Sequence, residues 1–206
     1  ILDTFGWRVL WFISTGITVI WILVLWNPIA VWQQAQIHVA NQQSIIANVR
    51  RTLRVTGGVL VAACFSVYAT QHISMMNWLP TYMIEVYASG TLIAAGIPAL
   101  VLIFNGCGNY LAAWAMGRGI PIWLLLALGA SGMALAELGI FSEAVPDAVR
   151  LALALGFGVA GGLIPASALA AAPVYAPTPI LIGSLSGIMV MGSNTGQLFG
   201  PPALAA

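Results

Sequence analysis

The sequence contains no lysine and little charge of either sign. Its 206 residues include six arginines, five acidic residues and two histidines, and the net charge is +1. A protein that binds nucleic acid through a basic patch, or nucleotide phosphates through a glycine-rich loop, needs a motif that this chain lacks. We therefore predict no nucleic-acid partner and no cofactor.

Cysteine is scarcer still. Cys64 and Cys107 lie inside apolar segments, and neither has a metal-ligand spacing or a partner. We predict no metal site, and we expect both thiols to pack as small apolar groups.

Apolar residues make up most of the chain. Hydrophobic residues account for 61% of it and charged residues for 5%, and the mean hydropathy is +0.99. A water-soluble fold does not have enough interior to bury so much apolar surface. The sequence therefore predicts an integral membrane protein that is surrounded mostly by lipid.

Six apolar segments are long enough to cross the membrane as helices, which takes about 20 residues each. They are approximately Trp7–Trp26, Val55–Trp78, Thr91–Met116, Ile122–Phe141, Val149–Val174 and Ile180–Ala206. These segments are too long, and alternate too little, for the strands of a membrane barrel. The predicted fold is all-α with six transmembrane helices, of which the last five form a compact bundle of antiparallel neighbours.

The arginines predict the orientation. Four of the six lie in the connection after the first segment or in the turn after the third: Arg50, Arg51, Arg54 and Arg118. Basic residues accumulate in cytoplasmic loops, so both connections are expected in the cytoplasm. Arg8 and Arg150 fall on the opposite side, where Asp3 and Asp147 lie close in sequence.

One connection is long. Residues 27–54 are rich in Gln and Asn at first and basic at the end. Ile45, Ile46, Val49 and Leu53 recur at helical spacing, as in a helix lying on an anionic membrane surface. A solvated interdomain linker with a basic anchor explains the same residues and is the simpler interpretation. The chain begins without Met and its last apolar segment still continues at Ala206, so we expect a fragment.

Polar side chains within the second segment are the first candidates for a functional site. Tyr68 and His72 share one helical stripe with Phe65 and Met75, and Gln71 lies beside it. An ionisable residue in lipid is costly unless it faces protein or water, so His72 should face a cavity or a neighbouring helix. Imidazole titrates near neutral pH, which makes His72 the candidate for proton coupling. A neutral histidine hydrogen-bonded to another helix is the alternative.

Amide side chains form a second set of candidates. Asn105 and Asn109 share a face of the third segment, with glycines between them that allow close helix approach, and Asn194 and Gln197 share a face of the sixth. Buried amides without partners are expensive, so each pair should meet another helix or a wet path. Interhelical hydrogen bonding and the lining of a substrate route are both consistent with the pattern.

Small residues predict where helices pack closely. Gly158 and Gly162 form a small-xxx-small pair in the fifth segment, and Gly183 and Gly187 form another in the sixth. Such faces let two backbones approach each other.

One enzymatic motif is present. Residues 129–132 read Gly-Ala-Ser-Gly, which resembles the nucleophile motif of rhomboid intramembrane proteases. Ser131 would need a histidine base on the sixth segment, but His38 lies in the long connection and His72 on the second segment. Proteolysis is therefore kept as an alternative, beside a non-catalytic six-span subunit. Glu137 lies near the outer end of its segment and is expected to be interfacial.

The order of several motifs resembles the major facilitator superfamily of transporters. Gly6–Arg8 resembles the start of helix six, and Trp78–Glu85 resembles the outer end of helix seven. Gly108–Pro121 is similar to the turn after helix eight. Ala176–Pro179 and Gly192–Pro202 look like helix eleven and its start. The outer end of helix seven looks like the cyanate transporter-like branch. The turn lacks the Asp and the second basic residue of the full loop signature.

This resemblance implies a secondary transporter of a small solute that works by alternating access without ATP. Residues 1–26 would be the last helix of the N-terminal half, 27–54 the cytoplasmic interdomain loop, and 55–206 a truncated C-terminal bundle in the cell membrane. The rest of the N-terminal half would be missing. Helices seven and ten line the cavity in that family, and helices eight and eleven flank it. The resemblance thus ranks Tyr68, Gln71 and His72 first, and the four amides second.

Overall fold

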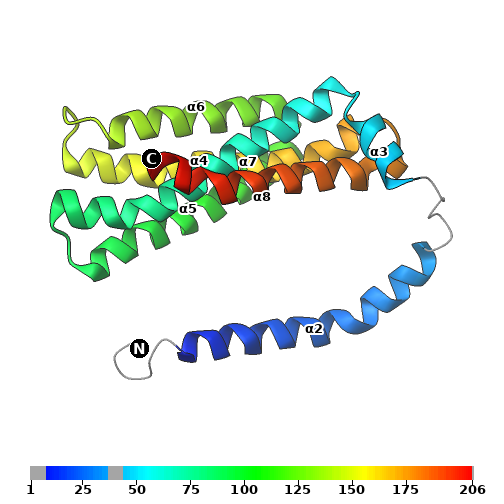
Figure 1. Ribbon diagram of the computed structural model, residues 1–206, viewed down its shortest axis with the longest axis horizontal. Coiled ribbons are helices and arrows are strands. Elements are labelled where there is room, and N and C mark those ends of the chain that lie inside the picture. Colours follow the sequence, from blue (N-terminus) through cyan, green and yellow to red (C-terminus); the bar gives the residue numbers. More distant parts are fainter. Residues whose placement is uncertain (1–7, 37–43, 206) are drawn as a thin grey trace. The chain divides into compact units, whose positions relative to one another are not determined.

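The computed structural model describes residues 8–36 and 44–205, in which all regular structure is helical (Figure 1). The chain divides into two compact units, residues 1–44 and 45–206, and each is described by itself. The described part of the first unit is mainly one helix. The second unit is a bundle of long helices.

Helix α2 (Arg8–Gln36) contains the first predicted membrane span. It continues ten residues beyond the predicted end at Trp26, so Asn27–Gln36 is helical rather than a loop. Alanine and glutamine favour a helix, and α2 continues through Pro28 even though proline is unfavourable inside a helix. Nearly all side chains of residues 8–26 are exposed.

The second unit starts with the short helix α3 (Ile45–Thr52), which confirms that the apolar spacing of this stretch is helical. The remaining elements are α4 (Thr56–Tyr87), α5 (Thr91–Gly117), α6 (Ile122–Ile140), α7 (Asp147–Tyr175), the 3-10 turn η2 (Pro179–Leu181) and α8 (Ile182–Ala205). Helix α3 packs against α8, and its Thr52 is buried.

Five helices of the described residues are long and apolar enough to cross a membrane: α2, α4, α5, α6 and α7. They match the first five predicted spans. The sixth predicted span forms helix α8, but α8 is not among the five. Its glycines and its polar residues Ser193, Asn194 and Gln197 dilute the apolar character that a span requires.

The closest packing in the bundle is between parallel helices, which differs from the predicted arrangement of antiparallel neighbours. Helices α5 and α7 form one such pair and α4 and α8 another (Figure 1). Val101 lies against Gly158, and Asn105 lies against Gly162, so the contacts advance in the same direction along α5 and α7. Helix α6 packs antiparallel to α7.

Glycine sets the separation of α5 and α7. A methyl group added at Gly162 would lie 2.8 Å from Gly108 Cα and 2.8 Å from Asn109 N, and one added at Gly158 would lie 3.1 Å from Phe104 Cβ. Only hydrogen atoms fit between the two backbones here. The predicted small-xxx-small pair in the fifth segment is therefore confirmed as a close-packing face.

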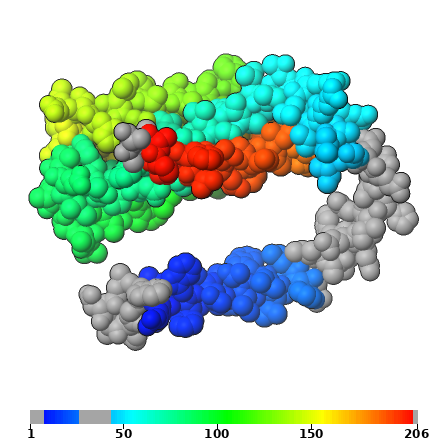
Figure 2. Space-filling model, viewed as in Figure 1, coloured from blue at the N-terminus to red at the C-terminus, as the bar shows by residue number. Residues whose placement is uncertain are grey.

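A different set of glycines joins α8 to α4, and the two helices lie side by side in the space-filling view (Figure 2). The contacts pair three hydroxyl residues of α4 with three glycines of α8: Ser66 with Gly192, Thr70 with Gly196, and Ser74 with Gly200. The predicted pair at Gly183 and Gly187 is wrong, because an added methyl group at either would meet no atom within 4 Å. Spacing alone does not say which helical face meets a neighbour.

The core lies between α4, α5, α6, α7 and α8. Its largest fully buried apolar side chains are Phe157, Met133, Ile164, Leu185, Met189 and Val101. Cys64 packs against this core as predicted, whereas Cys107 is exposed on α5, so the expectation that it packs is wrong.

Candidate functional site

A polar network lies where α4, α5 and α7 meet. Asn105 Nδ2 donates to the Tyr68 hydroxyl at 3.3 Å, which joins α5 to α4. Asn109 Nδ2 donates to the carbonyl oxygen of Asn105 at 3.0 Å and to its Oδ1 at 3.2 Å. The expectation that these amides meet another helix is confirmed for Asn105. The hydrogen bonds of Asn109 stay within α5.

Gly161 of α7 leaves room for this network. A methyl group added there would lie 3.3 Å from Asn105 Nδ2 and 3.4 Å from the Tyr68 ring. The amide and the phenol thus pack directly over the α7 backbone. The network is half-buried, and its groups can both donate and accept hydrogen bonds without carrying a charge.

His72 lies one helical turn further along α4 and is 6% exposed. Its ring centroid is 5.4 Å from that of Tyr68 and 6.0 Å from that of Phe157 on α7, and the His72 and Phe157 rings are nearly parallel. His72 Nε2 is buried and has no hydrogen-bond partner among the residues that the structure describes. Buried polar atoms are almost always paired, so this nitrogen is the unsatisfied position of the site.

Gln71 points to a different neighbour from Tyr68 and His72. Its Nε2 donates to Glu137 Oε2 of α6 at 2.6 Å. Both side chains line an open pocket of about 740 Å³, together with Ser74, whose hydroxyl is buried without a partner, and Trp78. The structure therefore separates Gln71 from the Tyr68 network.

Glu137 is the residue that reasoning from the sequence missed. It was expected at an interface, and the structure gives it a partner on α4 in addition. The available signal was a single carboxylate in an otherwise apolar helix, because such a group needs a polar partner or water. Its partner could not be read from the sequence, since α4 and α6 are separated by the whole of α5.

The two amide candidates of α8 do not join the network. Asn194 and Gln197 are both exposed, and Gln197 Nε2 donates to Ser193 Oγ at 3.1 Å within the same helix. Their spacing predicts one polar face, but the buried polar residue of that stretch is Ser193, which is 6% exposed.

The structure does not assemble the pair that a serine protease needs. Ser131 is exposed on α6, whereas His72 is buried between α4 and α7. His38 lies outside the described residues. Over residues 8–36 and 44–205 there is no group of three or more His, Cys, Asp or Glu side chains that could hold a metal ion.

A family model described as the Major Facilitator Superfamily matches residues 1–201 of the chain. The comparisons with curated proteins and with solved structures gave no match.

Proposed function

Because the chain belongs to the Major Facilitator Superfamily, it is a multi-pass membrane transporter of small molecules, and we propose that it moves its solute by alternating access past Tyr68, Asn105 and His72. The observation that carries this proposal is the unpaired Nε2 of His72 beside the Tyr68–Asn105 hydrogen bond. A small solute would give this nitrogen the partner it lacks.

The chemistry of these groups suggests the class of solute. Phenol, amide and imidazole offer hydrogen bonds, and the rings of Phe65 and Phe157 add apolar contact. A small polar solute with little or no charge fits this set best. The likeness of Trp78–Glu85 to the cyanate transporter-like branch makes cyanate the first probe.

Uptake into liposomes tests the proposal. The purified complete protein is reconstituted, and uptake of radiolabelled cyanate, urea, glycine and glucose is compared with that of empty liposomes. We expect one probe to accumulate and the Asn105→Leu variant to take it up at least tenfold more slowly. Replacing this amide leaves Tyr68 without its partner and removes a polar group from the route.

Asn194→Leu is the matched control, because it makes the same exchange at an exposed position outside the network. It should keep uptake within about twofold of the wild-type rate, as expected for an exposed substitution. Equal uptake by the Asn105→Leu and wild-type proteins would remove the network from the solute route.

The orientation and the two-half organisation are part of the same proposal. Residues 1–26 would form the last helix of the N-terminal half, 27–54 a cytoplasmic connection and 55–206 the C-terminal bundle, in the cell membrane. The positions of the arginines and the motif order support this assignment. A cysteine introduced at Ser44, in a variant without Cys64 and Cys107, should react with a membrane-impermeant maleimide only in inside-out vesicles. Reaction in right-side-out vesicles would reverse the orientation.

The protease alternative makes a different prediction for Ser131. This hydroxyl lies on the exposed surface of α6, away from His72, so Ser131→Ala should leave uptake unchanged. Cleavage of a membrane-protein substrate by the wild-type protein, lost in Ser131→Ala, would support the protease instead.

A further inference from the structure

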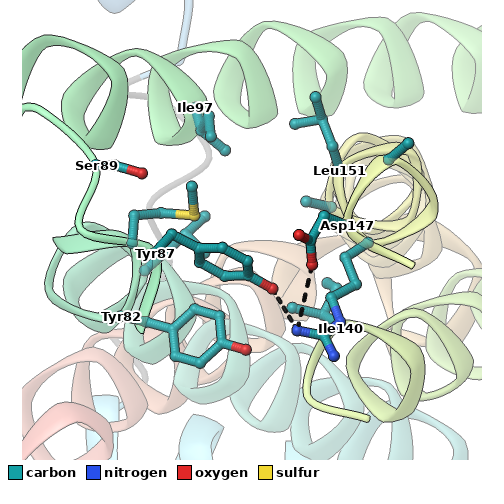
Figure 3. Close-up of a pocket in the computed structure, with 12 residues that line it drawn as sticks. Tyr82, Tyr87, Ser89, Ile97, Ile140, Asp147 and Leu151 are labelled. Carbon is teal, nitrogen blue, oxygen red and sulfur yellow. Dashed lines mark hydrogen bonds and ion pairs between the residues drawn. The ribbon is translucent and has the colours of Figure 1, made fainter. Parts of the chain in front are cut away.

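A second pocket lies where α4 and α6 end and α5 and α7 begin. Its volume is about 430 Å³, which is within the range of small-molecule sites. Its walls are mainly apolar and include Leu79, Met83, Ile97, Leu151 and Ala154. Figure 3 shows Ile97 and Leu151 across the pocket from Tyr87.

Arg150 brings a positive charge to this apolar pocket, and its side chain is only 15% exposed. One terminal nitrogen donates to the hydroxyl of Tyr87 and lies 3.7 Å from Asp147, while the other donates to the carbonyl oxygen of Ser142 at 2.6 Å. The third nitrogen, Nε, is buried and has no hydrogen-bond partner within residues 8–36 and 44–205. Tyr87 and Ser142 hold the guanidinium in place, and its Nε–H group stays unpaired.

The charge of Arg150 is poorly balanced by these contacts. Tyr87 and Ser142 contribute neutral groups. Asp147 carries the opposite charge, but its side chain is 73% exposed and the ion pair is long. Water screens such a pair, so its contribution is small. A buried cation with an incomplete counter-charge is costly, and a bound anion would offset that cost.

Two phenol groups surround the same position. Tyr82 and Tyr87 pack edge to face with their ring centroids 5.7 Å apart, and in Figure 3 Tyr87 lies next to Asp147 with Tyr82 below it. Each hydroxyl can donate to an acceptor oxygen, as the guanidinium does. The pocket therefore combines donors at one end with hydrocarbon walls elsewhere.

We propose that this pocket binds a small monocarboxylate, with its carboxylate at Arg150 and the Tyr82 hydroxyl, and its apolar part against Ile97, Leu151 and Met83. Guanidinium and carboxylate match in charge and in planar geometry. Among the described residues that line the pocket, Arg150 is the one cation and the largely exposed Asp147 the one carboxylate, and a single cation suits one added negative charge better than a phosphate dianion. The site is distinct from the Tyr68 network, since Tyr82 lies 14 residues, or roughly 21 Å, further along α4.

Benzoate binding tests the proposal. The purified full chain in a neutral detergent is titrated with benzoate and, separately, with its uncharged isostere benzamide, and binding is followed by saturation-transfer NMR. We expect saturable binding of benzoate and at least tenfold weaker binding of benzamide. Arg150→Gln should weaken benzoate binding at least tenfold.

Arg118→Gln is the matched control, because Arg118 stacks on the Trp114 ring at 3.7 Å and does not line the pocket. It should bind benzoate as the wild type does. Ile97→Trp fills the pocket and leaves Arg150 and its partners in place, so it should also abolish binding. If Arg150→Gln does not fold, benzoate binding by Ile97→Trp tests the proposal instead.

Three results would overturn the proposal. The first is equal binding of benzamide and benzoate. The second is wild-type affinity for benzoate in folded Arg150→Gln or in Ile97→Trp. The third is displacement of benzoate by phosphatidylglycerol, which would mark a lipid headgroup site. The assay measures binding without transport, so a failure here leaves the proposed solute route untouched. A failure of Asn105→Leu to slow uptake leaves the carboxylate site untouched in turn.

Discussion

Replacing Gly162 by leucine should prevent α5 and α7 from packing and leave little folded protein. The added side chain would begin 2.8 Å from the Gly108 Cα atom and from the Asn109 nitrogen. Both atoms belong to the α5 backbone and cannot rotate away, so the two helices must separate along their length. Overpacking of a core typically costs about 1–3 kcal/mol, and a clash between backbones should exceed that range.

Gly156→Leu is the matched control on the same helix. Gly156 is exposed, and a methyl group added there would meet no atom within 4 Å. Leucine also favours a helix over glycine, by roughly 0.5–1 kcal/mol. Size-exclusion chromatography and thermal unfolding in detergent should show a normal protein for Gly156→Leu and an aggregated or absent one for Gly162→Leu. Comparable melting temperatures would mean that α5 and α7 are not held together by this glycine face.

His72→Phe should separate stability from activity. Phenylalanine keeps the ring between Tyr68 and Phe157 and removes the buried Nε2 that lacks a partner. An unsatisfied buried polar group costs about 1–3 kcal/mol, so the melting temperature should stay the same or rise. Uptake of the probe that the wild-type protein transports should fall at least tenfold, because the free nitrogen of the proposed route is gone.

A phenylalanine at Leu60 provides the comparison, since this residue lies on the same helix and is 64% exposed. Leu60→Phe should change neither uptake nor melting temperature. If His72→Phe keeps the wild-type rate, affinity and pH dependence of uptake, His72 is a packing residue and proton coupling must be sought elsewhere. If the variant instead melts earlier and transports normally, the imidazole has a structural partner.

The sequence was sufficient to predict the long helices, because their length and apolar character are properties of each segment alone, but α8 is not among the described helices that are apolar enough to cross a membrane. The same holds for the helical stripe of α4, where Phe65, His72 and Met75 are all buried. The length of α2 was underestimated, because the apolar window was ended at Trp26, just before Asn27 and Pro28. Polarity marks where the apolar stretch ends, whereas the backbone hydrogen bonding of a helix can continue beyond it.

Contacts between helices were harder to predict, since they depend on how each helix is rotated about its axis. Gly158 and Gly187 belong to equally convincing small-residue pairs, yet only Gly158 meets a neighbouring backbone. Gln71 and His72 are adjacent in the sequence, yet one turns to Glu137 on α6 and the other to Phe157 on α7. The sequence could therefore name candidate residues one by one, but not which of them lie together in the fold.

The pairing of α4 with α8 bears on how the protein is synthesised. Helix α4 leaves the ribosome before α5, α6 and α7, so its three hydroxyl residues enter the bilayer well before the glycines that cover them exist. Ser66 and Thr70 donate to carbonyl oxygens of their own helix, at 2.8 and 2.9 Å, and need no partner in the meantime. Ser74 makes no such bond among the described residues. Two of the three hydroxyl groups of a newly inserted α4 are thus already paired in lipid, and the third meets its glycine only when α8 arrives.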